Sequence, residues 1–272
     1  MTQCYACGMS SLMLFPALAA ALGYLHAALR AAQARDSGLA LAGLVTALAL
    51  HAMVLIASVQ AVGGRLGVSQ ALSLLTWQSA LLLALLSRAT ALRPLRTAIY
   101  SISAAGVLLT VLWTSQPGGN APQDWRIALH AALSIFAAGL LTLAAAQAVA
   151  LDVLDRLLHQ PEQLARVLRM PPMQASEDWL FQLIAAGFFV LSLALLSGLI
   201  FVDDLFAQHL VHKTVLSILA WLIFGALLGG RRRWGWRGKR AVRWALSGYA
   251  ALITAYFGSK LVLEQLLGRH WS

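Results

Sequence analysis

Charge is what this sequence has least of. Charged residues make up only 11% of the 272 residues, hydrophobic residues make up 60%, and the mean hydropathy is +0.75. A soluble domain contains roughly 25% charged residues, so the composition excludes a soluble core as the main architecture. The net charge of +10 does not indicate a nucleic-acid partner, because the basic residues lie between apolar runs and not along one face.

Cysteine is almost as scarce, with only Cys4 and Cys7 present, in a C-x-x-C spacing. Such a pair fits a redox dithiol or half of a metal site, and it fits equally an N-terminal tip without a role. No histidine follows Cys7, so the pair is not a haem-attachment motif. The first residues also lack a basic segment, so we expect no cleavable signal peptide.

Catalytic motifs with a known mechanism are missing. The sequence has no glycine-rich phosphate loop, no Gly-x-Ser-x-Gly and no His-Glu-x-x-His. Phosphate binding, serine hydrolysis and zinc-dependent hydrolysis depend on these patterns. The sequence therefore predicts a protein that is not an enzyme.

Long apolar runs dominate what is present. An apolar helix of about 20 residues spans a bilayer. Eight stretches have this character: 10–29, 38–62, 69–91, 95–115, 125–151, 180–202, 211–230 and 241–263. The sequence therefore predicts an all-α polytopic membrane helical bundle with eight transmembrane helices.

The basic residues set the predicted orientation. Fifteen of the 20 Lys and Arg residues lie in the first, third, fifth and seventh connections. Basic connections stay in the cytoplasm, so both termini are predicted to lie outside. The fifth connection, 152–179, also shows an amphipathic pattern from Pro161 to Pro172, which predicts a helix on the membrane surface.

Histidines mark the candidate site. His130 lies just inside the predicted outer end of the fifth span, and His212 lies at the outer mouth of the seventh, one helical turn after His209. Polar residues within a membrane often mark function, and imidazole binds iron, copper and zinc. Two interpretations remain open: His130 and His212 ligate a metal or haem, or each lies at a hydrated helix end. His51, at mid-span, either has a function or bonds the backbone of a neighbouring helix.

Lysine at the end of the last span has two possible roles. Lys260 lies near the predicted outer end of the span 241–263. A lysine there can extend to the lipid headgroups. Alternatively it pairs with Asp203, Asp204 or an anionic propionate.

Segments near the C-terminus resemble the cytochrome c assembly protein family. The resemblance rests on residues 212–225, 234–240 and 256–260, and residues 181–184 and 203–209 are similar to its small eight-span YpjD/HemX-like branch. It implies a multi-pass protein of a bacterial inner (cytoplasmic) membrane, with a membrane domain over 39–267 after a first span and N-terminal tip over 1–38. It also implies that the protein binds haem at its outer face and aids cytochrome c maturation, with other maturation proteins as partners.

The resemblance also implies a haem site. His130 and His212 would be the axial ligands of the iron, with His209 in reserve and Lys260 near a propionate. The chain departs from the larger family members because no tryptophan lies between residues 198 and 214, where they have a tryptophan-rich haem platform. Trp125 and Phe206 are expected to wall the porphyrin instead. The alternative is a transporter-like or structural membrane factor that keeps the fold without haem.

Overall fold

The computed structural model describes residues 2–33, 38–61, 63–64, 67–113, 124–160, 162, 170–201 and 211–258. Helices account for nearly all of these residues, and no strand occurs among them. The all-α prediction is therefore confirmed. The outward orientation of the termini stays a prediction, as does the domain boundary near residue 38.

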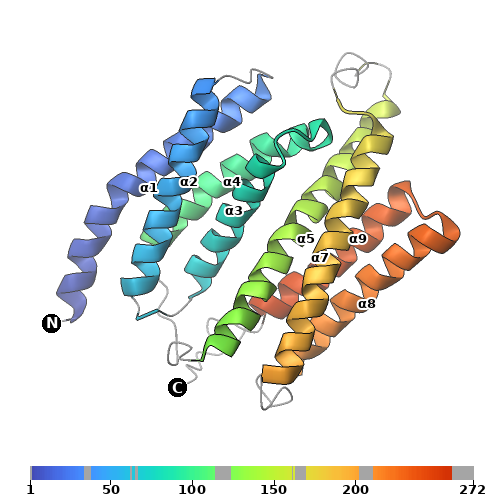
Figure 1. Cartoon of the computed structure of the whole chain (residues 1–272). Helices are drawn as coiled ribbons and strands as arrows, with labels where there is room; N and C mark the ends of the chain where they lie inside the picture. The colour runs from blue at the N-terminus through green and yellow to red at the C-terminus, as the bar shows by residue number, and fades with distance from the viewer. Residues whose placement is uncertain are drawn as a thin grey trace. The chain divides into compact units, whose positions relative to one another are not determined.

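Eight long helices form two compact units, drawn in Figure 1. The first unit contains α1 (Thr2–Ala32), α2 (Gly38–Ala61), α3 (Val68–Leu85) and α4 (Arg93–Leu112) from Leu95 onward. The second contains α5 (Trp125–Leu158), α7 (Met173–Phe201), α8 (Val211–Trp234) and α9 (Gly238–Ile253), together with Ser87–Pro94. A 3-10 turn, η1 (Thr90–Leu92), precedes α4, and a π-helical turn, η3 (Thr254–Gly258), follows α9.

Seven of these helices are long and apolar enough to cross a membrane. They are α1 to α5, α7 and α8, with η1 counted together with α4. The eighth predicted span begins as α9, which is 16 residues long and carries basic residues in its first two turns. The remainder of that predicted span continues beyond residue 258, outside the described part of the chain.

The connection between α5 and α7 is shorter than the sequence predicted. We expected a loop over 152–179, but α5 continues to Leu158 and α7 already begins at Met173. The polar residues there remain helical because they have partners: Asp152 pairs with Arg156 one turn later, and Glu177 bonds the α8–α9 turn. The predicted surface helix falls mainly on residues 163–169, which are outside the described ones.

Small residues let the helices of the first unit approach one another. A Cβ atom added at Gly23 of α1 would lie 2.9 Å from Ala47 Cβ of α2, and Ala20 is fully buried. Large apolar side chains such as Leu22 and Ile56 are exposed instead. This inside-out pattern is expected where lipid surrounds the helices and close packing of small residues joins them.

The second unit is an antiparallel arrangement in which α5 packs on α7, α7 on α8 and α8 on α9 (Figure 1). A Cβ atom at Gly187 of α7 would meet Leu141 of α5 at 2.7 Å. One at Gly248 of α9 would lie 2.9 Å from Phe224 Cζ of α8. Gly248 therefore lies at a close contact between α9 and α8.

Candidate functional site

His130 joins the first turns of α5 to the last turns of α7. Helix α5 begins at Trp125 because the Asp124 carboxylate caps it, accepting a 2.9 Å hydrogen bond from the Arg126 amide. His130 follows about one and a half turns later and is half-buried. Its Nδ1 lies 2.9 Å from the Ala194 carbonyl oxygen and 3.1 Å from Ser197 Oγ, both on α7.

These contacts determine which ring nitrogen of His130 carries the proton. A carbonyl oxygen can only accept, so Nδ1 donates to Ala194. The Ser197 hydroxyl donates its own proton to the same carbonyl at 2.8 Å. Its oxygen is therefore free to accept from His130 Nδ1–H, which is shared between Ala194 and Ser197. The neutral imidazole then keeps a lone pair on Nε2, which has no hydrogen-bond partner within the described ranges. Histidines that ligate metals usually show this arrangement, with one nitrogen bonded to a carbonyl and the other free to coordinate.

Glycine makes the approach of this ring to α7 possible. A Cβ atom at Gly198 would lie 2.9 Å from His130 Cε1 and 3.3 Å from Nδ1. Neither Ala194, Ser197 nor Gly198 was predicted as a site residue. The one signal was the small Ser-Gly pair inside a leucine-rich run, which is typical of a close helix contact in a membrane.

Aromatic and cationic side chains lie at the same end of α5 and α7. The rings of Trp125 and Phe201 are 6.1 Å apart, and the Arg126 guanidinium lies 5.9 Å from the Trp125 ring centre. Trp125 is 67% exposed, so most of its ring is open to a ligand. Phe206, expected beside Trp125, lies outside the described residues.

The remaining predicted ligands are located only in part. Because α5, α7 and α8 run alternately up and down, α8 begins at the end of the unit that holds His130 (Figure 1). The backbone of His212 is in the first turn of α8, while its side chain is outside the described part. His209, Lys260, Asp203 and Asp204 also lie outside it.

The described donors at this end can be compared with the ligands that a metal ion or haem requires. The described residues contain no group of three or more His, Cys, Asp or Glu side chains that could hold a metal ion. A structural zinc site needs four such ligands, whereas haem iron needs only one or two axial ones. His130, whose Nδ1 bonds the Ala194 carbonyl, has the chemistry of one such axial ligand, and Trp125 and Arg126 lie at the same end of α5.

His51 in the first unit is occupied on both sides of its ring. It is fully buried, its Nδ1 lies 3.2 Å from the Tyr24 hydroxyl, and its Nε2 lies 2.8 Å from Ser73 Oγ. The expected backbone partner was wrong: hydroxyls on α1 and α3 satisfy the ring because each can donate or accept. Since both nitrogens are engaged, His51 offers no lone pair for a metal.

An ion-pair clamp holds the other end of the second unit. Glu177 of α7 is buried and accepts a 2.7 Å hydrogen bond from the Gly238 amide at the start of α9. Arg231 and Arg237 each place a nitrogen 3.8 Å from its carboxylate, and Arg231 also bonds Asp178 at 3.2 Å. No pattern in the sequence indicated that this carboxylate and the α8–α9 turn would meet.

Comparison with known proteins identifies relatives along the chain. The family model described as "Cytochrome C assembly protein" matches residues 9–267. "Inner membrane protein YpjD" of Escherichia coli K12 is 37% identical over 139 residues, which are 51% of this chain and 52% of YpjD. An "Uncharacterized 28.8 kDa protein in nifR3-like 5'region" of Azospirillum brasilense is 36% identical over 154 residues, 55% of this chain and 56% of that protein.

More distant relatives carry a functional name. "Cytochrome c biogenesis protein CcsA" of Prochlorococcus marinus (strain NATL1A) is 29% identical over 93 residues, 34% of this chain and 30% of CcsA. The chain spans about half the length of the first two relatives. No solved structure matches it. Because the family model matches nearly the whole chain and seven described helices can cross a membrane, this multi-pass inner membrane protein belongs to the cytochrome c assembly protein family.

Proposed function

We propose that this protein binds haem at the end of its second unit that contains His130, and that it aids cytochrome c maturation in this way. The observation that carries the proposal is the Nδ1–H bond from His130 to the Ala194 carbonyl, which leaves Nε2 as a Lewis base. The family description and the name of the CcsA relatives support a role in cytochrome c assembly.

Each residue at this end has a distinct role in the proposal. His130 Nε2 would bind the haem iron together with His212, in the first turn of α8, with His209 in reserve. Trp125 provides an exposed aromatic face. Arg126 and Lys260 would pair with the haem propionates. Lys260 lies outside the described residues.

Haem, when bound, supplies a redox-active iron that cytochrome c requires. The chain itself then binds and orients and does not catalyse a reaction, so we propose that it is not an enzyme. Its partners would be other cytochrome c maturation proteins, reached at the membrane surface where α5 begins. The competing function is that of a transporter-like or structural factor with the same fold and no haem.

The test is haem content in purified full-length protein. The chain is solubilised in detergent after expression with haem supplied, and absorbance is measured per mole of protein. His130→Ala and His212→Ala are each expected to lower haem content and to remove the six-coordinate low-spin spectrum. His159→Ala is the matched control, because His159 is an exposed histidine at the far end of the same helix.

Two results would count against this proposal. A parent protein that never takes up haem favours the transporter-like or structural function. Parent-like spectra in both His130→Ala and His212→Ala would show that these residues are not the ligands.

A further inference from the structure

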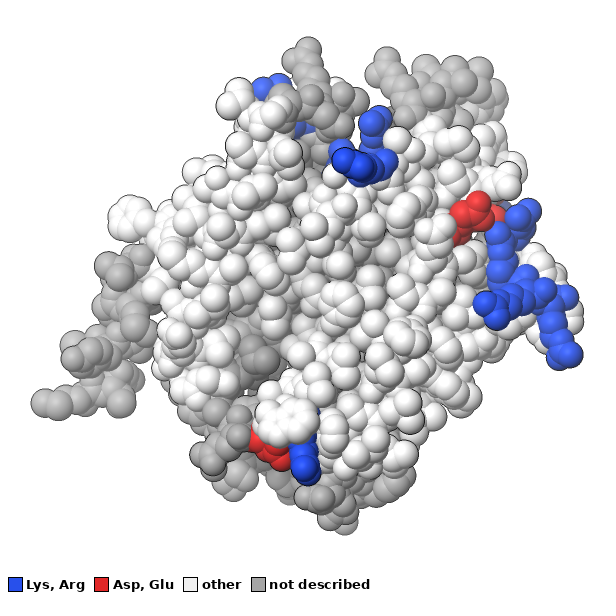
Figure 2. Space-filling model, in the orientation of Figure 1, with Lys and Arg blue, Asp and Glu red and all other residues white. Residues whose placement is uncertain are grey.

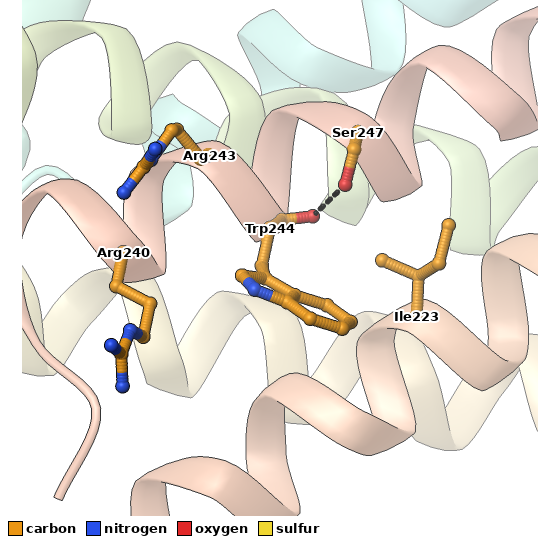
Figure 3. A pocket seen from close by; sticks show the side chains of 5 residues that line it. All are labelled: Ile223, Arg240, Arg243, Trp244 and Ser247. Carbon is orange, nitrogen blue, oxygen red and sulfur yellow. Dashed lines mark hydrogen bonds between the residues drawn. The ribbon is translucent and has the colours of Figure 1, made fainter.

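A pocket of about 520 Å³ opens between α8 and α9, close to the basic turn that joins them. Figure 3 shows its lining: Arg240, Arg243, Trp244 and Ser247 lie on α9, and Ile223 lies across from them on α8. The two arginines lie on the same side of Trp244, toward the start of α9, while Ile223 and Ser247 lie on its other side. The pocket therefore has a cationic end and a less polar end.

The arginines of this pocket are not neutralised by the clamp. Arg231 and Arg237 pair with Glu177, and Lys239 pairs with Asp155 at 3.3 Å. Figure 2 shows Lys and Arg side chains gathered beside acidic groups at the edge of the molecule. No ion pair involves Arg240 or Arg243 within the described ranges.

Packing holds one of these arginines in place. The Arg240 guanidinium lies 5.4 Å from the centre of the Trp236 ring, which is itself 5.2 Å from the Trp244 ring. Arg243 follows one turn later and is exposed. Two guanidinium groups on one helix face are therefore available to an anion, and a guanidinium binds phosphate oxygens in a bidentate manner.

The two ends of the pocket lie at different distances from the start of α9. With a rise of about 1.5 Å per residue, Arg240 lies about 3 Å and Ser247 about 13 Å from the start of the helix at Gly238. The Ser247 hydroxyl already bonds the Trp244 carbonyl at 3.0 Å. Next to the pocket, α8 exposes Leu219 and Leu222, which face lipid in a membrane protein. If the basic turn lies at the membrane surface, as the positive-inside rule predicts, the arginine end of the pocket is at headgroup level and the Ser247 end is nearer the acyl region.

We propose that this pocket binds an anionic phospholipid. Arg240 and Arg243 hold the phosphate, and the first part of an acyl chain lies against Trp244 and Ile223. Basic pockets between transmembrane helices at a cytoplasmic surface suit such headgroups, and the positive-inside rule places this turn in the cytoplasm. The combination of an uncompensated arginine pair with an adjoining lipid-facing surface favours a lipid over a soluble anion.

The test compares phosphatidylglycerol with phosphatidylcholine on the detergent-solubilised full chain, with bound lipid counted by native mass spectrometry. The parent is expected to bind phosphatidylglycerol about tenfold or more in preference, given the attraction of two basic residues to an anionic headgroup. Arg240→Gln with Arg243→Gln is expected to abolish that preference. Arg232→Gln with Arg233→Gln removes the same charge from the neighbouring last turn of α8, outside the pocket lining, and is expected to retain the preference.

A second variant tests the pocket without changing charge. Ser247→Trp fills the inner end from an exposed position and is expected to reduce phosphatidylglycerol binding several-fold. Equal loss in the two double variants, or full binding in Ser247→Trp, would overturn the proposal. Complete displacement of phosphatidylglycerol by millimolar inorganic phosphate would assign the pocket to a free anion and would also overturn it.

Discussion

Gly198→Ala is expected to weaken haem binding although it replaces none of the proposed ligands. The added carbon would lie 2.9 Å from His130 Cε1, whereas carbon atoms in ordinary contact are about 3.5 Å or more apart. The ring must therefore retreat by roughly 0.6 Å, which stretches its 2.9 Å bond to the Ala194 carbonyl past the usual limit of about 3.2 Å. Overpacking of this kind costs typically about 1–3 kcal/mol.

This cost destabilises the haem-bound state. Without haem the His130 ring can rotate away from the added carbon, whereas a ring that ligates iron cannot. A loss of about 2 kcal/mol corresponds to roughly 30-fold weaker binding. The assay is a haem titration of the detergent-solubilised protein, followed at the Soret band. Gly229→Ala is the matched control, because nothing lies within 4 Å of a Cβ atom there, and its dissociation constant should equal that of the parent.

One result would refute this reasoning. If His130→Ala loses haem but Gly198→Ala binds as tightly as the parent, the ligating ring does not rest against α7. An equal loss in Gly229→Ala would instead show that any glycine-to-alanine change in these helices disturbs binding.

Two further predictions concern packing and orientation. Gly248→Leu should lower the yield of monodisperse protein in size-exclusion chromatography more than Ala250→Leu, because Gly248 faces Phe224 at close range whereas Ala250 is exposed; equal yields would contradict the α8–α9 contact. Reporter fusions after Gly118 and Gly238 should report outside and inside, respectively, because basic residues favour the odd-numbered connections; the opposite pattern would reverse the predicted orientation.

The helices were largely predictable because apolar length is a local property of the sequence. Their ends were less so, as the early start of α7 shows: Glu177 looks like a loop residue until its partner on the α8–α9 turn is known. The same limit applied to Ser87–Pro94, where part of the predicted third span is a turn and a short 3-10 helix. A polar residue can stay in a helix when a distant segment satisfies it, and a local pattern does not contain that information.

The sequence allowed the type of residue at the candidate site to be predicted, but not the contacts that the residue makes. His130 was singled out because an imidazole in an apolar span needs a partner. The identity of that partner follows from the rotation of α5 against α7, which brings Ala194 and Ser197 to the ring. For His51 the same reasoning named the wrong kind of partner. Its ring bonds the hydroxyls of Tyr24 on α1 and Ser73 on α3, and not a backbone group.

The clamp at Glu177 fixes more than the turn that it contacts. If the α8–α9 hairpin slid along α7 by one helical turn, about 5.4 Å, this buried carboxylate would lose the Gly238 amide and its arginines. A buried carboxylate that loses its hydrogen-bond donor costs at least about 1–3 kcal/mol, so the hairpin is held at a single height. Helix α8 has 24 residues and is therefore about 36 Å long. The level of the first turn of α8 along α7 is thus set from the opposite end of the hairpin.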